Sequence, residues 1–296
     1  MIQKSGHRFS DQIMREEKSM GFTRNFSLEA TRPDAAEIAA LAAILPPGTP
    51  VYLTAVPTVD PQAQVGAAAG LRKAGLEPVA HIAARRIASA KQLSELLAGL
   101  RGEADIKRLL IIGGDVESSG PFADALSVIQ NGGLREAGIE DIGIGGYPEG
   151  HPRIALSRLE AALDQKIAAA RAAGLRVSIV SQFSFSPERI VAWLRQLRAC
   201  GITVPVKVGM AGPASVTGLL RYAKRCGVSA SLRGLMSGTG RGLIGQVAGQ
   251  AAGPDAILAA LETAGDLGAS PHYFSFGGAV ETARYACEAA AGRIAA

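Results

Sequence analysis

The segment LRVSIVSQFSFSPERIVAWLRQLRACGITVPVKVG, residues 175–209, contains the unit from which the fold of this chain can be predicted. An apolar run at 175–185 predicts a buried strand, and the amphipathic stretch after it is typical of a helix. Ser186 and Pro187 are residue types favoured at a helix cap and a first helical turn. A second apolar run follows at 204–209. Both runs are apolar on both faces, which indicates parallel strands covered by helices.

The same strand–helix unit recurs along the whole chain. Apolar runs predict eight strands, at 22–30, 51–56, 77–83, 107–114, 141–146, 175–185, 204–209 and 270–278. Helical patterns lie between them, one of them starting after Ser89, a good N-cap residue. This order predicts a single (β/α)8 barrel, with one domain over residues 1–296 and an N-terminal helical extension at 1–20. A doubly wound open sheet is the alternative architecture.

Composition limits the classes of function. The 296 residues are 48% hydrophobic, enough for a large core, and the formal net charge of +5 suits small anionic ligands. No long Lys/Arg run occurs and aromatic residues make up 5%, which argues against nucleic-acid binding. The three cysteines form no CxxC pair, and no run reaches the ~18 apolar residues of a membrane span. We therefore expect a cytoplasmic protein without a membrane partner.

Polar residues gather where the predicted strands end. Active sites of (β/α)8 barrels lie at the C-terminal ends of the strands, so residues placed there are candidates for function. Each has an ordinary structural explanation as a cap, a turn residue or a hydrogen-bonded core residue, and the prediction depends on their joint position. These residues are Glu29, Thr54, His81, Asp115, Tyr147, Glu149, His151, Gln182 and Lys207.

Two other site types are weakly supported. The four histidines have no metal-ligand spacing, so we expect no metal. Residues 240–245 match GxGxxG, but the preceding segment is a poor strand and no acidic residue closes a following strand, as a dinucleotide site of that type requires. A loop over the barrel mouth, 238–245, is the alternative interpretation.

With these residues in place, the chain resembles the methylenetetrahydrofolate reductase family from about Phe22 to Cys287. YPEGHP together with SQFSF at this spacing is the most specific part of the resemblance. The segments that carry it are SLEATRP (27–33), PVAHIAA (78–84), IIGGD (111–115), YPEGHP (147–152), SQFSF (181–185) and PHYFSFGGAVETARYA (271–286).

The resemblance implies a barrel that carries FAD and reduces methylenetetrahydrofolate to methyltetrahydrofolate with NAD(P)H. That chemistry needs a proton at the departing nitrogen and a negative charge beside the iminium cation that results, and one acid can supply both. The resemblance assigns this catalytic role to Glu29, with Asp115 beside the flavin and the pterin. It further assigns substrate binding to Gln182 and Phe183, and cofactor binding to Thr54, His81, Tyr147 and His151.

Some family positions are altered here. Gly113 stands where the family has an arginine, Gly277 replaces the closing asparagine, and Lys166 is out of register with a lysine that contacts the flavin phosphate. Because these are mostly flavin and nucleotide contacts, two forms of enzyme remain open. FAD is held by substitute contacts from Arg85, Arg86 or Arg241, or hydride passes directly from NAD(P)H to the folate.

A third hypothesis is a folate-binding protein without reductase activity. The sequence leaves open the choice between NADH and NADPH and the physiological direction. It also leaves open whether apolar helix residues such as Trp193 form a homo-oligomer interface.

Overall fold

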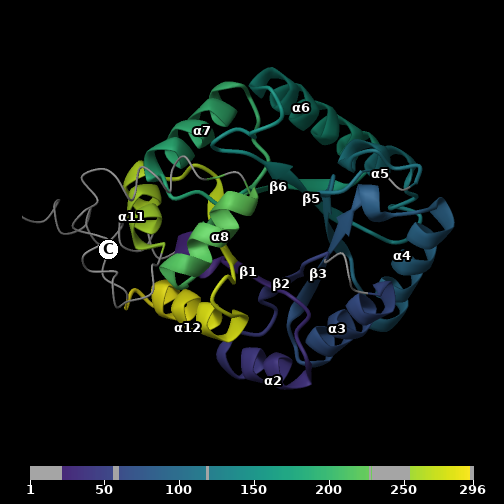
Figure 1. Cartoon of the computed structure of the whole chain (residues 1–296), viewed down its shortest axis with the longest axis horizontal. Coiled ribbons are helices and arrows are strands. Elements are labelled where there is room, and N and C mark those ends of the chain that lie inside the picture. The colour runs from purple at the N-terminus through teal and green to yellow at the C-terminus, as the bar shows by residue number, and fades with distance from the viewer. Residues whose placement is uncertain (1–21, 56–59, 118–119, 227, 229–253, 294–296) are drawn as a thin grey trace, which may run out of the picture.

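Eight parallel strands form a closed barrel in chain order in the computed structural model, which describes residues 22–55, 60–117, 120–226, 228 and 254–293 (Figure 1). The (β/α)8 prediction is confirmed, and the open-sheet alternative is wrong. The strands are β1 (Ser27–Ala30), β2 (Pro50–Leu53), β3 (Glu77–Ala83), β4 (Arg108–Ile112), β5 (Asp141–Gly146), β6 (Arg176–Ser181), β7 (Val206–Ala211) and β8 (Ala269–Phe274).

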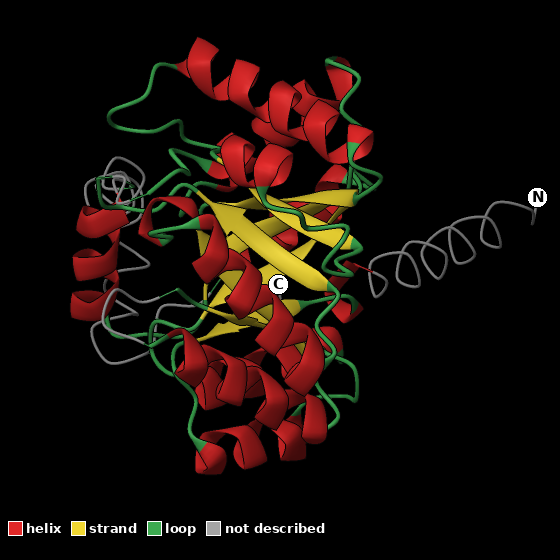
Figure 2. Ribbon diagram, turned by 90° about the vertical axis from the view of Figure 1, so that its right-hand side faces the viewer, coloured by secondary structure: helices red, strands yellow, loops and turns green. Residues whose placement is uncertain are grey.

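Most helices surround the strands on the outside of the barrel, while α8 lies over one end of it (Figures 1 and 2). A short 3₁₀ helix, η1 (Ala84–Arg86), follows β3. Among the described residues, no helix is long and apolar enough to span a membrane. The helices are α2 (Ala35–Ile44), α3 (Pro61–Lys73), α4 (Ala90–Ala104), α5 (Ala125–Asn131), α6 (Leu156–Ala172), α7 (Pro187–Ala199), α8 (Val216–Cys226), α11 (Asp255–Ala264) and α12 (Ala279–Ala290).

The barrel closes where β8 pairs with β1. Ser27 is opposite His272, and Leu28 is opposite Tyr273. Because successive side chains of a strand point to opposite faces, Leu28 packs in the main core between strands and helices, while Ser27 and Glu29 face the barrel interior. Closure therefore places a polar residue of the last strand beside the polar residues of the first.

Apolar side chains fill the middle of the barrel. Tyr52, Val79, Leu110 and Val180 form a small cluster there, separate from the core outside the strands. The barrel is thus packed at mid-height, as in other barrels of this type, and polar groups are left to its two ends.

The predicted helix caps at Ser89 and Ser186 are confirmed. The Ser89 side chain accepts a hydrogen bond from the backbone N–H of Gln92, and Ser186 accepts one from that of Arg189. Pro187 occupies the first turn of α7, as predicted.

Several strand boundaries differ from the prediction. Residues 22–24 are helical, and β1 begins only at Ser27. β2 ends at Leu53, and β6 ends at Ser181, so 182–185 follow the strand instead of belonging to it. The placement of Lys207 among the strand-end residues is wrong, since it is the second residue of β7 and lies toward the N-terminal end of the barrel. The segments 1–20 and 238–245 lie outside the described residues, so the single-domain prediction for 1–296 stays a prediction.

Candidate functional site

The carboxyl group of Glu29 lies inside the barrel between two histidines from distant strands. Its Oε1 is 3.7 Å from Nε2 of His81 on β3 and 3.5 Å from Nε2 of His272 on β8. Both distances exceed those of a good direct hydrogen bond. Neither Nε2 has a hydrogen-bond partner among the described residues. The three side chains therefore lie close together, and Nε2 of each histidine remains able to form a hydrogen bond with a ligand.

Burial controls the protonation of this cluster. It raises the pKa of Glu29 to about 7, and the Coulombic effect of His81 offsets only part of the rise. Burial also lowers the pKa of His81 to about 4 and that of His272 to about 3. At neutral pH both imidazoles are uncharged, so Glu29 has no cation close by to keep it ionised, and it can hold a proton.

The sequence prediction did not include His272 among the site residues, nor the residues that contact its ring. The Oγ of Ser27 is 2.8 Å from Nδ1 of His272, which fixes the ring, and the ring of Tyr52 lies edge-on at 4.6 Å between centroids. Ser275 Oγ donates to the backbone carbonyl of Glu29 at 2.5 Å. Barrel closure was the signal that could have found His272, because a closed barrel pairs the last strand with the first.

Glu29, His81 and His272 have the residue types of a metal site but not its arrangement. In the described part of the chain, no group of three or more His, Cys, Asp or Glu side chains is placed to hold a metal ion. The two imidazoles instead face one carboxylate oxygen.

A rim of charged groups lies beyond the ends of β2, β3 and β4. Arg86 of η1 forms an ion pair with Asp115, and its Nη1 donates to the carbonyl of Ala55 at 3.2 Å. The Asp115 side chain is 55% exposed, so this pair contributes little stability and Asp115 can exchange partners when a ligand arrives. Thr54 donates from Oγ1 to Thr31 at 3.0 Å on the same rim.

The segment after β5 adds an aromatic pair. The rings of Tyr147 and His151 meet edge to face at 5.5 Å. Burial raises the pKa of Tyr147, with Arg85 opposing, and lowers the pKa of His151, with Arg153 and Arg85 contributing. Arg85 is thus close enough to act electrostatically on both rings.

Gln182 and Phe183 follow β6 but lie in different surroundings. The Oε1 of Gln182 accepts the backbone N–H of Phe183 at 3.0 Å, and its amide nitrogen has no hydrogen-bond partner among the described residues. That amide nitrogen is left to donate to a ligand.

Phe183 is only 1% exposed. It packs beneath α8 with Phe185, Phe274 and Phe276, so it belongs to the packed aromatic layer next to the site.

The rim fits a cofactor that carries phosphates and hydroxyls. Nε of Arg86 and both carboxylate oxygens of Glu149 are buried there without a hydrogen-bond partner among the described residues. A Cβ added at Gly113 would lie 3.6 Å from Nη2 of Arg85, so the Arg85 guanidinium occupies the space beside this glycine. Arg85 therefore brings a cation to the strand end where Gly113 supplies none.

The structure thus brings the eight residues to which the resemblance assigns a role to one end of the barrel, in two groups. Glu29 and His81 lie inside the barrel with His272. The others lie on or below the rim, and these are Thr54, Asp115, Tyr147, His151, Gln182 and Phe183. Their roles in binding and catalysis stay predictions.

A change of Glu29 to Gln should alter stability in a pH-dependent way. Because the pKa of Glu29 is about 7 in the folded protein and its ordinary value is 4.5, its contribution is fully present below pH 4.5 and is lost as the pH rises through 7. Relative to Glu29→Gln, the wild type should therefore lose about 3 kcal/mol of unfolding free energy between these limits. Urea unfolding of both proteins across pH 4 to 8 measures it, and a difference that does not change with pH contradicts the assignment.

Comparison with known proteins agrees with the fold and with the motifs. The sequence model of the methylenetetrahydrofolate reductase family matches residues 54–232, more than half of the chain. An uncharacterized protein from Clostridium thermocellum that binds two copies of 5-methyl-5,6,7,8-tetrahydrofolic acid has a TM-score of 0.54 at 12% identity, over 93% of this chain and 97% of that one. Dihydropteroate synthase from Thermus thermophilus has a TM-score of 0.48 at 14% identity, over 91% and 93%, too low to support an argument.

The family match includes Thr54, His81, Asp115 and the segments YPEGHP and SQFSF, while Glu29 lies before it and His272 after it. The matched range extends over more than half of the chain. The chain therefore belongs to the methylenetetrahydrofolate reductase family.

Proposed function

We propose that the protein is an oxidoreductase of one-carbon metabolism that interconverts methylenetetrahydrofolate and methyltetrahydrofolate with NAD(P)H. The observation that carries the proposal is the carboxyl group of Glu29, buried inside the barrel with a pKa of about 7. A carboxyl group with this pKa exchanges its proton near neutral pH, as a general acid must. Family membership supplies the folate as the substrate class.

Glu29 performs the proton transfer. In its protonated form it donates to the departing nitrogen of the methylene bridge, and that carbon–nitrogen bond breaks to leave an iminium cation on the folate. The resulting carboxylate then lies beside the cation and stabilises it in a site from which water is largely excluded. When bound, NAD(P)H or a reduced flavin supplies the hydride that turns the methylene carbon into a methyl group.

His81 and His272 leave the carboxyl group of Glu29 able to hold its proton. Uncharged His81 and His272 border the carboxyl group without the full charge that would hold it ionised. Ser27 orients the ring of His272 through its Nδ1. We therefore assign both histidines a positioning role for the acid.

The residues at the strand ends orient the substrate. The amide nitrogen of Gln182, which has no partner among the residues that the structure describes, can donate to an acceptor on the pterin edge, while Oε1 accepts from the backbone N–H of Phe183. Asp115 can leave Arg86 and accept donors of the pterin. Phe183 fixes the floor of this region by its packing under α8.

The nucleotide cofactor binds on the rim. Arg85, Arg86 and the rings of Tyr147 and His151 would hold it, with the buried carboxylate of Glu149 available to its hydroxyls. Two alternatives remain for this cofactor. If hydride passes through a flavin, these residues would hold FAD, and if it passes directly to the folate, they would hold NAD(P)H.

A folate-binding protein without turnover is the second candidate. The similarity to the Clostridium thermocellum protein, which binds two copies of a methylated folate, is in keeping with it. The buried acid favours the enzyme, because binding alone does not require a carboxyl group that titrates near pH 7.

Glu29→Gln should abolish turnover while folate binding persists. Loss of a general acid lowers the rate by about 100- to 10,000-fold, whereas the isosteric amide keeps the shape of the site. The assay is oxidation of NADH and of NADPH with methylenetetrahydrofolate, with folate affinity measured by calorimetry. Glu95→Gln on α4, 65% exposed, is the control and should keep full activity.

Two results would contradict the proposal. Full turnover in Glu29→Gln removes the acid from the mechanism. A wild-type protein that binds folate but oxidises neither NADH nor NADPH, with or without FAD, is a binding protein.

Arg85→Met should weaken dinucleotide binding about tenfold, the effect of losing one charge-assisted hydrogen bond. The protein is stripped of flavin, and activity is measured before and after FAD is restored. Activity that returns only with FAD assigns the rim to flavin, and activity without FAD assigns it to NAD(P)H. Arg171→Met, exposed on α6, is the matched control. Unchanged affinity for both dinucleotides in Arg85→Met would exclude this rim as the cofactor site.

A further inference from the structure

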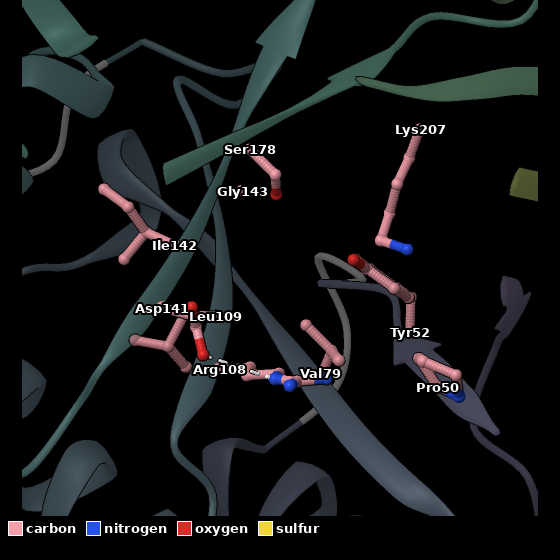
Figure 3. Close-up of a pocket in the computed structure, with 10 residues that line it drawn as sticks. All are labelled: Pro50, Tyr52, Val79, Arg108, Leu109, Asp141, Ile142, Gly143, Ser178 and Lys207. Carbon is pink, nitrogen blue, oxygen red and sulfur yellow. Dashed lines mark hydrogen bonds and ion pairs between the residues drawn. The ribbon is translucent and has the colours of Figure 1, made fainter. Parts of the chain in front are cut away.

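A cavity opens at the N-terminal end of the barrel, opposite the strand ends that carry the candidate functional site (Figure 3). Its volume is about 110 Å³. It is lined by Pro50, Tyr52, Val79, Arg108, Leu109, Asp141, Ile142, Gly143, Ser178 and Lys207. Most of these residues lie in the first half of their strands, which defines this end of the barrel.

Lys207 supplies a cation without a counter-ion. Its side chain enters the cavity from β7, and its ammonium group forms no ion pair or hydrogen bond with any described residue. Burial lowers its pKa to about 8, and the nearby charge of Arg108 contributes. A partly buried ammonium group beside a second cation is unfavourable unless an anion joins it.

The acidic residue of the lining does not neutralise Lys207. Asp141 is held by Arg176, with contacts of 2.6 Å to Nε and 2.7 Å to Nη2, and by Nε of Arg108 at 3.4 Å. The hydrogen bond from Arg176 is the main cause of the lowered pKa of Asp141. Two guanidinium groups therefore already share this carboxylate, and the cavity keeps an excess of positive charge.

Two neutral donors face the same space as Lys207. The hydroxyl groups of Tyr52 and Ser178 both line the cavity, and neither has a hydrogen-bond partner among the described residues. In Figure 3 both hydroxyls and the ammonium group of Lys207 point into the space between β2, β6 and β7. An ammonium group and two hydroxyls that converge in this way are suited to the oxygens of an anion.

We propose that this cavity binds a small oxyanion through Lys207, Arg108, Tyr52 and Ser178. The chemical class is inorganic phosphate, sulfate or a short carboxylate. The cavity, with a volume of about 110 Å³, has room for an anion of this size. The proposal is independent of the function proposed above, because it concerns the opposite end of the barrel.

Tyr52 connects the two ends. Its hydroxyl lines this cavity, and its ring packs edge-on against His272 of the Glu29 cluster. The charge of Lys207 also contributes to the lowered pKa of His272. A bound anion would therefore be in electrostatic reach of the candidate acid site.

Calorimetric titration of the full-length protein with inorganic phosphate, sulfate and acetate tests the proposal. At least one of these anions should bind saturably. Lys207→Met should weaken that binding at least tenfold, and Tyr52→Phe, which keeps the ring packing, should weaken it severalfold. Lys91→Met, a lysine 84% exposed on α4, and Arg171→Met, exposed on α6, should leave it unchanged.

Thermal unfolding distinguishes lost binding from lost structure. Lys207→Met removes a partly buried cation that has no partner in the described part of the chain, so it should unfold at the same temperature as the wild type or at a higher one. Absence of saturable binding of all three anions to the wild type would overturn the proposal. Equal affinity in Lys207→Met would also overturn it.

Discussion

The pairing of β8 with β1 is the constraint on which the site depends. It closes the barrel, and it brings His272 within 3.5 Å of Glu29 from the far end of the chain. Glu29 is buried in the closed barrel, and this burial raises the pKa of its carboxyl group. The same contact therefore determines both the geometry of the acid and its pKa.

Polar groups at the two ends of the barrel are separated by the packed middle. Toward the C-terminal ends of the strands lie the acid Glu29 and two uncharged histidines, and at the N-terminal end lies Lys207, a cation that forms no ion pair with any described residue. Tyr52 contacts both regions, with its ring against His272 and its hydroxyl in the opposite cavity. One aromatic side chain thus contacts both the proposed reaction site and the proposed anion site.

The order of elements could be predicted from sequence because each strand is a short apolar run and helix starts are encoded locally, as at Ser89 and Ser186. The exact ends of the strands could not be predicted in this way. Whether residues 22–26 or 182–185 join a strand depends on a partner strand, and an apolar pattern contains no information about the partner. Residues 22–24 are an example, since they are helical in the structure although their pattern predicted a strand.

The candidate site was predicted in part, for a related reason. Polar residues at or near the ends of the predicted strands identified Glu29, His81 and the YPEGHP segment. His272 was missed because its importance arises only when the last strand pairs with the first. Lys207 was placed at the wrong end, because an apolar run does not show how far along the strand a residue lies. The position of Arg85 beside Gly113 and the burial of Glu149 likewise required three-dimensional neighbours.

The most direct test of the account is the titration of the Glu29 carboxyl group itself. Carbon-13 NMR of protein labelled at glutamate side-chain carboxyls, with the Glu29 signal assigned by its absence in Glu29→Gln, gives the pKa without any assay of activity. A midpoint near 7 is the result that burial between two uncharged histidines predicts. A midpoint near the ordinary value of 4.5 would mean that Glu29 is ionised at neutral pH, and the proposed proton donor would not exist.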